Sequence, residues 1–330
     1  MRFRIPLLLA AEILLLCCQK PLDVKQEGLS IVLDNDFSLP FRPEAAAPYH
    51  FGVLLYDDAS GELSYEDFCE TRGGLVPGRS GLFTVVVYDL DNSALRFDGK
   101  ASLESFRVYS EEEGAAMKNG FFACQQALST RVSEDGFRIT SVKGNVGFEE
   151  GPVIQEPDNL FAGVKRHVNI PAFAQNKEEF SFQLSTRFAL QQGRIRLRGI
   201  QNTQYIYSVR AYLTNVARGR YLGTDLPEES PAILSFSLNS IQEDFIEGTF
   251  NHFGLLSDTE KPNTAYIIIT DVSGGMYLYV TDVSTSLRQG EDLSVRWDYE
   301  LPSPETGSAG FSPVLNDWGA VWYDVPIGLP

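Results

Sequence analysis

Short runs of valine, isoleucine, phenylalanine and tyrosine, separated by glycine, aspartate and asparagine, are the feature that most restricts how this chain can fold. Such runs occupy residues 51–57, 81–90, 204–216 and 264–284, among others. Segments rich in β-branched and aromatic residues and bounded by turn residues are typical of antiparallel strands. Residues 111–128 predict one short helix, although two glycines weaken it. The sequence therefore predicts an all-β fold.

The length of the chain indicates how these strands divide into domains. A chain of 330 residues corresponds to about two domains. The segment Ile170–Asn176 separates two strand-rich halves. We therefore expect two tandem β-sandwich domains, at residues 49–172 and 173–330. In the second, residues 264–284 predict a hairpin around Ser273-Gly274-Gly275.

The N-terminus has the features of an export signal. Arg2 and Arg4 precede an apolar stretch at residues 5–16, which is too short for a transmembrane helix of about 20 residues. The stretch ends in Cys17-Cys18, and a polar segment follows. We expect residues 1–17 to be a lipoprotein signal peptide, with Cys18 as the lipidated residue and Cys17 as the alternative. An ordinary cleaved signal is the competing interpretation. Residues 18–48 are expected to be a tether that carries a first strand at residues 30–34.

The charge of the chain limits its partners. Lys and Arg number 27 and Asp and Glu 44, which gives a formal net charge of −17. A general nucleic-acid binder would be basic instead. An acidic body also does not favour lying on anionic lipid, so the N-terminal lipid is the expected membrane contact. Arg194, Arg196 and Arg198 alternate along one strand face, and we expect them to pair with neighbouring carboxylates.

Motifs that carry chemistry are incomplete in this sequence. Residues 73–80 approach a phosphate loop, but Arg79 replaces its lysine and a strand follows instead of a helix. Residues 89–93 approach a calcium loop, but Ala94 and Lys100 replace its glycine and glutamate. The three histidines lack metal-ligand spacing, and no nucleophile elbow is present. We therefore expect no enzyme activity, no cofactor and no metal site.

Two cysteines follow the signal, Cys69 and Cys124. In an exported protein they could form a disulfide that closes a loop of roughly 55 residues. Two free thiols are the other interpretation, because the sequence does not indicate whether their Cα atoms lie within bonding distance.

Several short phrases resemble the fimbrillin-associated lipoproteins of Bacteroidota, in particular an uncharacterised-domain family akin to the minor-fimbrium anchor subunits. The lipobox-like Leu15–Cys18 resembles the family's signal end. The segments Val85–Asn92 and Glu156–Gly163 resemble its strand-and-turn and Pro-Asp-x-Leu-Phe-Ala-Gly phrases. The hairpin at residues 264–284 and the ending that begins at Asn316 resemble its second domain.

The resemblance implies two transthyretin-like, Greek-key sandwiches on a lipid-anchored protein of the outer membrane, exposed at the cell surface. It implies binding to fimbrial shaft or accessory subunits by β-strand complementation, in which an open strand edge accepts a partner's strand. In polymerising relatives a protease, often cutting after an arginine, removes the first strand, and Arg72 and Arg79 in the Gly-rich segment are the candidate cut positions here. The terminal strand is the expected donor or intramolecular plug, with Trp318, Val321, Trp322, Val325 and Ile327 as its candidate residues.

A different class of function stays open beside the fimbrial one. Exposed aromatic residues on similar β domains would also suit a surface lipoprotein that binds a glycan or another host ligand. Loss of binding after mutation of solvent-facing aromatic residues would favour this alternative, whereas co-purification with fimbrial subunits would favour the first.

Overall fold

The structure is a computed structural model of the whole chain. It describes residues 29–39, 41, 47–76, 80–92, 94–130, 137–143, 151–172, 180–258, 260–303, 314–316 and 320–322. The signal peptide and both candidate lipidation sites, Cys17 and Cys18, lie outside these residues.

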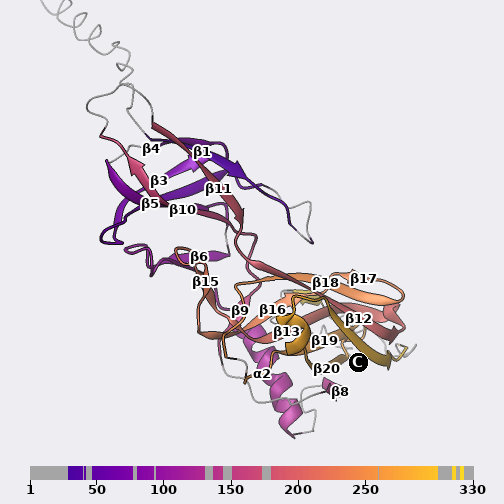
Figure 1. Cartoon of the computed structure of the whole chain (residues 1–330). Helices are drawn as coiled ribbons and strands as arrows, with labels where there is room; N and C mark the ends of the chain where they lie inside the picture. The colour runs from indigo at the N-terminus through magenta and orange to yellow at the C-terminus, as the bar shows by residue number, and fades with distance from the viewer. Residues whose placement is uncertain are drawn as a thin grey trace, which may run out of the picture.

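The first domain is a closed β-barrel (Figure 1), whose strands follow the order β1-β11-β10-β5-β2-β3-β4. Its core contains inward-facing residues such as Phe51, Val53 and Val85. The strand β1 lies within the predicted tether and closes the barrel between β11 and β4. The expected first strand is therefore present and belongs to the domain. The barrel strands are β1 (Leu29–Asn35), β2 (His50–Asp57), β3 (Leu63–Glu70), β4 (Gly73–Val76), β5 (Gly81–Asp89), β10 (Phe161–Ile170) and β11 (Phe180–Phe188).

The second domain is a sandwich of two sheets. The six-stranded sheet has the order β8-β20-β19-β13-β16-β9, and the four-stranded sheet has the order β17-β18-β12-β21. The predicted hairpin is β19–β20, and the Asp271 carboxylate caps its turn by accepting bonds from the backbone N–H of Ser273 and Gly275. The strands are β8 (Phe137–Lys143), β9 (Val153–Gln155), β12 (Gln191–Gln201), β13 (Ile206–Ala217), β16 (Pro231–Ser237), β17 (Ser240–Ile241), β18 (Phe245–His252), β19 (Thr264–Asp271), β20 (Met276–Asp282) and β21 (Leu293–Glu300).

Helical segments are few in the described residues. The predicted helix is present as α2 (Ala115–Thr130). Its apolar face, which includes Phe121 and Cys124, packs with Tyr212, Tyr266 and other residues of the six-stranded sheet. Two short elements complete this domain, η1 (Thr203–Tyr205) and α3 (Ser284–Arg288).

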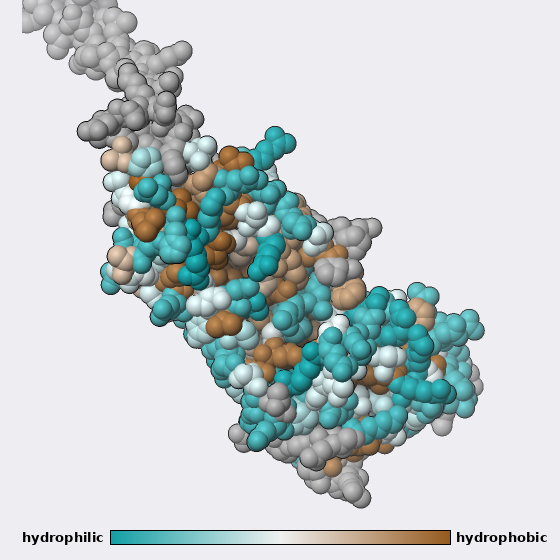
Figure 2. Space-filling model, in the orientation of Figure 1, coloured by the Kyte–Doolittle hydropathy of each residue, from teal (hydrophilic) through white to brown (hydrophobic). Residues whose placement is uncertain are grey.

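A small connecting sheet lies between the barrel and the sandwich (Figure 1) and has the order β15-β14-β7-β6. Its strands are β6 (Leu95–Asp98), β7 (Arg107–Ser110), β14 (Gly219–Tyr221) and β15 (Leu226–Pro227). One hydrophobic cluster runs from Tyr56 and Tyr88 on the outer wall of the barrel, through Phe106, to Trp297 in the sandwich. Figure 2 shows hydrophobic residues gathered over the barrel and its junction, whereas the visible face of the sandwich is mainly hydrophilic.

The all-β prediction is confirmed, and strand pairing crosses the predicted boundary between residues 172 and 173 in both directions. The strands β8 and β9 precede that boundary, yet they pair with β20 and β16 of the sandwich. The strand β11 follows the boundary, yet it pairs with β1 and β10 of the barrel. The chain therefore enters the second domain, returns to the first and enters the second again. Hydrogen bonding between sequence-distant strands decides this division, and local composition carries no signal of it.

Candidate functional site

One strand of the sandwich has an open edge among the described strands. In that part of the chain β21 pairs only with β12, to which it runs parallel. The register shifts between Arg198 and Ile200. Gly199 lies there with φ +86°, and a Cβ atom at this position would lie 2.5 Å from Asp298 Oδ1. The bulge therefore depends on glycine and brings the end of β12 close to β21.

The two faces of β21 differ strongly. Leu293, Val295 and Trp297 are buried, whereas Ser294, Arg296 and Asp298 are exposed. This alternation is that of a half-buried strand with one face on the core. The buried face is aromatic: the Trp297 ring lies 5.0 Å from the ring of Tyr279, and the Tyr299 ring 5.5 Å from that of Tyr277.

The edge strand β8 of the opposite sheet lies on the same side of the sandwich as β21. Lys143, the last residue of β8, donates a 3.1 Å hydrogen bond from Nζ to the Arg296 carbonyl oxygen. The Tyr279 hydroxyl donates to the same oxygen at 3.1 Å. Because the carbonyl and N–H of one residue point to the same side of a strand, the backbone of Arg296 faces the open edge. Side chains thus cover one acceptor of this edge.

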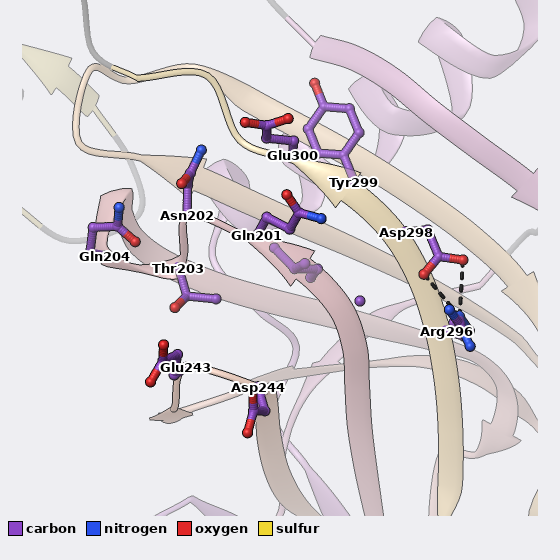
Figure 3. A pocket seen from close by; sticks show the side chains of 12 residues that line it. Gln201, Asn202, Thr203, Gln204, Glu243, Asp244, Arg296, Asp298, Tyr299 and Glu300 are labelled. Carbon is purple, nitrogen blue, oxygen red and sulfur yellow. Dashed lines mark hydrogen bonds and ion pairs between the residues drawn. The ribbon is translucent and has the colours of Figure 1, made fainter.

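An open polar groove of about 720 Å³ lies at the carboxyl end of β21 (Figure 3). Four carboxylates line it, from Glu243, Asp244, Asp298 and Glu300, beside amides and the single cation Arg296. Arg296 Nε donates to Asp298 Oδ1 at 2.9 Å. Burial is the main cause that raises the pKa of Tyr299, and the nearby Asp271 charge also raises it. The groove is therefore acidic, and the Tyr299 hydroxyl within it stays protonated at neutral pH.

The candidate cysteine pair is not a disulfide in the structure. Cys69 and Cys124 are both free and buried. Cys69 belongs to the barrel core, whereas Cys124 on α2 packs against the six-stranded sheet. The two residues lie in separate cores, because α2 belongs to the second domain. Burial raises the pKa of the Cys69 thiol to about 11 and also raises that of Cys124.

Of the remaining predicted site residues, some lie within the described residues and some outside them. Arg72 is exposed in the turn between β3 and β4. Val321 and Trp322 lie in β23 (Ala320–Trp322), which pairs with β22 (Val314–Asn316). Arg79, Trp318, Val325 and Ile327 lie outside the described residues.

Two of the three expected arginine pairs are present, those of Arg194 and Arg196. Arg194 Nε donates to Asp292 Oδ2 at 2.9 Å, and Arg196 Nε donates to Glu247 Oε2 at 2.6 Å. The charges of Arg194 and Arg196 on this face of β12 are therefore neutralised by neighbouring carboxylates, as expected for these two residues.

Within the described ranges, no group of three or more His, Cys, Asp or Glu side chains could hold a metal ion. No helix of the described part is both long and apolar enough to cross a membrane.

These features define an all-β protein of two interleaved domains with an open strand edge beside an acidic groove. The chain belongs to the DUF5119 family: the model of this domain of unknown function matches residues 38–237. No curated protein matches the sequence.

Solved structures match this chain at low sequence identity. A candidate adhesin from Bacteroides ovatus matches with a TM-score of 0.58 and 13% identity, over 88% of this chain and 98% of that chain. The fimbrial anchor protein Mfa2 from Porphyromonas gingivalis has a TM-score of 0.46 and 10% identity, over 82% and 90% of the two chains. A second candidate adhesin from Bacteroides ovatus has a TM-score of 0.46 and 11% identity, over 85% and 89%. The first match supports a common fold.

Proposed function

We propose that this protein is a lipid-anchored fimbrial anchor or accessory subunit of the outer membrane, exposed at the cell surface, that binds partner subunits by β-strand complementation. The observation that carries the proposal is the open edge of β21. A strand added there would extend the four-stranded sheet by backbone hydrogen bonds. The fold shared with a candidate adhesin is consistent with this class of function.

The cover over Arg296 makes acceptance of a strand selective. A long, flat and uncovered edge would pair with any extended chain, and proteins limit this by placing charged side chains on such edges. Here Lys143 and Tyr279 occupy the Arg296 carbonyl. An incoming strand must break these two hydrogen bonds and supply one backbone N–H in their place. Binding is therefore favourable only for a partner that makes additional contacts.

The groove supplies such contacts for a partner of suitable charge. Its carboxylates outnumber its cations four to one. A partner segment that presents lysine or arginine here would be favoured by complementary charge, chiefly through a faster association rate. We therefore expect the partner strand to be followed or preceded by basic residues.

The chain's own end is the second part of the proposal. Glu300 ends β21, and Trp318 to Leu329 follow in sequence. This segment, with Trp318, Val321, Trp322, Val325 and Ile327, is proposed as the donor to a partner or as an intramolecular plug. Cys18, or alternatively Cys17, is proposed to carry the lipid. Arg72 and Arg79 are the positions where a maturing protease would cut, and an anchor subunit would remain uncut there.

Two experiments test these statements. Intact and N-terminal mass spectrometry on membranes of the native host is expected to find a chain that starts at Cys18 with added acyl mass. A start after Arg72 or Arg79 would instead indicate a polymerising subunit.

The edge itself is tested by pull-down of fimbrial subunits with a matched pair of variants. Arg296→Pro removes a backbone N–H that faces the open edge, whereas Arg296→Ala removes only the side chain. We expect Arg296→Pro to lose partner capture and Arg296→Ala to retain it. Equal capture by both variants would exclude β21 as the acceptor edge.

Glycan binding remains the second candidate, because aromatic side chains are exposed on the barrel. Tyr49 is 59% exposed and Phe68 is 66% exposed. Binding to a glycan array that is lost in Tyr49→Ala or Phe68→Ala, without loss of partner capture, would favour this function.

A further inference from the structure

The first strand of the barrel is held on both sides by different kinds of pairing. All seven residues of β1, Leu29 to Asn35, pair with β11 in parallel. Four of them also pair with β4 in the antiparallel direction. Ile31 and Leu33 point into the barrel core. The strand is therefore fixed by two ladders and by buried side chains.

The path of the chain determines how force would reach this strand. The N-terminal residues lead into β1, so tension from the membrane side would pull on Leu29. On the other side, β11 ends at Phe188, and β12 of the sandwich begins at Gln191. Figure 1 shows β11 running from the barrel toward the second domain. Tension from a partner on the second domain would thus pull on the carboxyl end of β11.

Parallel pairing converts these two pulls into shear. Because β1 and β11 run in the same direction, a pull on the start of β1 and a pull on the end of β11 act in opposite directions along one axis. All seven ladder positions then bear the load together. In an antiparallel hairpin pulled from its two ends, by contrast, the bonds would open one at a time.

Polar side chains strengthen the end of the ladder nearest the second domain. Asn35 accepts a hydrogen bond from the Thr186 hydroxyl on β11 through Oδ1, and its Nδ2 donates to the carbonyl of Thr71 beyond β3. The Asp36 N–H extends the ladder by donating to the Thr186 carbonyl at 3.1 Å. Thr186 is buried. Asn35 therefore ties β1 to both neighbouring parts of the barrel.

We propose that β1 and β11, locked by Asn35, form a shear clamp that carries tensile load between the N-terminal attachment of the protein and its second domain. This inference rests on the proposed function, in which the N-terminus is fixed to the membrane and partners pull on the sandwich. The clamp gives a physical reason for an anchor subunit to retain β1: once that strand is lost, the load path is cut.

Single-molecule force spectroscopy tests the clamp directly. The chain from Cys18 onward is attached through the Cys18 thiol, where the lipid would sit, and through Glu243→Cys in an exposed turn of the sandwich. Cys69 and Cys124 are buried and do not compete for the thiol linkers. Under this load, Asn35→Ala is expected to open the barrel about tenfold faster, which corresponds to about 1.4 kcal/mol of barrier.

Matched variants and a second pulling geometry separate the clamp from general stability. Asp34→Ala changes an exposed side chain on the same strand and is expected to leave the opening rate unchanged. Attachment through Ser60→Cys in the turn between β2 and β3, with Cys18→Ser, bypasses β1. There the effect of Asn35→Ala is expected to fall below about threefold. If Asn35→Ala does not fold, Thr186→Val removes the same hydroxyl donor at nearly constant shape.

The outcomes are distinguishable from failure of the proposed function. Equal acceleration by Asn35→Ala in both geometries, or opening under the first load that does not change with Asn35→Ala, would overturn the clamp. Neither result depends on lipidation, because the thiol linker replaces the lipid. Lipidation is judged separately by N-terminal mass spectrometry of the native protein.

Discussion

A single methyl group at Gly73 is expected to disrupt closure of the barrel. Gly73 begins β4 with φ +100°, a conformation that L-residues with a side chain rarely adopt. A Cβ atom there would lie 1.8 Å from the carbonyl oxygen and 2.8 Å from the carbonyl carbon of Ile31 on β1. Both are backbone atoms, so no side-chain rotation relieves the overlap. The strands β1 and β4 must separate if the alanine is to fit.

The cost of Gly73→Ala has two parts. The unfavourable backbone conformation costs about 1–3 kcal/mol, and forcing atoms into a packed site costs about 1–3 kcal/mol more. The sum, about 2–6 kcal/mol, is a large part of the 5–15 kcal/mol that typically stabilises a domain. The matched control is Gly61→Ala, because Gly61 has φ +72° but no heavy atom within 4 Å of the added Cβ.

Equilibrium unfolding in urea measures both variants against the wild type. Gly61→Ala is expected to lose only the conformational part of the free energy of unfolding, and Gly73→Ala to lose both parts. Hydrogen exchange should locate the additional loss in β1 and β4. If the two alanine variants unfold at the same urea concentration, the close approach of β1 and β4 at Gly73 does not exist as described.

Three further predictions concern ionisable and charged groups. Burial lowers the pKa of His252 to about 4, and a hydrogen bond with the Gly254 backbone opposes this shift. The unfolded chain then binds a proton near pH 6.5 but the folded one only near pH 4. As the pH falls from about 6.5 to about 4, the free energy of unfolding should therefore decrease by on the order of 3 kcal/mol. This decrease should be absent in His252→Gln. Burial raises the pKa of Asp89 to about 7, while the Asp91 N–H opposes it. Stability should accordingly decrease as pH rises from about 4 to 7, and Asp89→Asn should be more stable than wild type at pH 8 but similar at pH 4 in thermal unfolding. Lys143→Met removes one of the two side-chain hydrogen bonds to the Arg296 carbonyl and leaves that of Tyr279. The association constant for self-association should therefore rise about two- to tenfold in sedimentation analysis. Lys165→Met, which removes a bond to the Gln183 carbonyl on the barrel, is the matched control and should leave this constant unchanged.

Local pattern identified most strands and indicated which of them are buried, but it did not show what covers their second face. The runs at residues 51–57 and 81–90 are apolar almost throughout and became β2 and β5. Continuous apolar runs predict strands that are buried on both faces. The structure supplies the second face: Val53 and Val85 point into the barrel, whereas Leu54 and Val86 join the cluster shared with the sandwich.

The open edge of β21 was not predicted, although its sequence contained part of the signal. The segment Leu293–Glu300 alternates between apolar and polar residues, which identifies a strand with one solvent-facing side. Whether such a strand lies at an edge depends on which other strands occupy its two sides. Lys143, which covers this edge, is more than a hundred residues away, and sequence alone does not connect it to Arg296.

The amino-acid sequence by itself determined the secondary structure and the class of fold. Alternation, turn residues and side-chain volume act over a few residues, so they specify where strands such as β19 and β20 begin and end. Tertiary structure alone decided that the two domains interleave, that Cys69 and Cys124 lie in different cores, and that β21 keeps an open edge. Each of these depends on pairing between distant segments, because a backbone hydrogen bond contributes the same energy whichever strand supplies the partner. Only the simultaneous burial of all the apolar faces selects one arrangement.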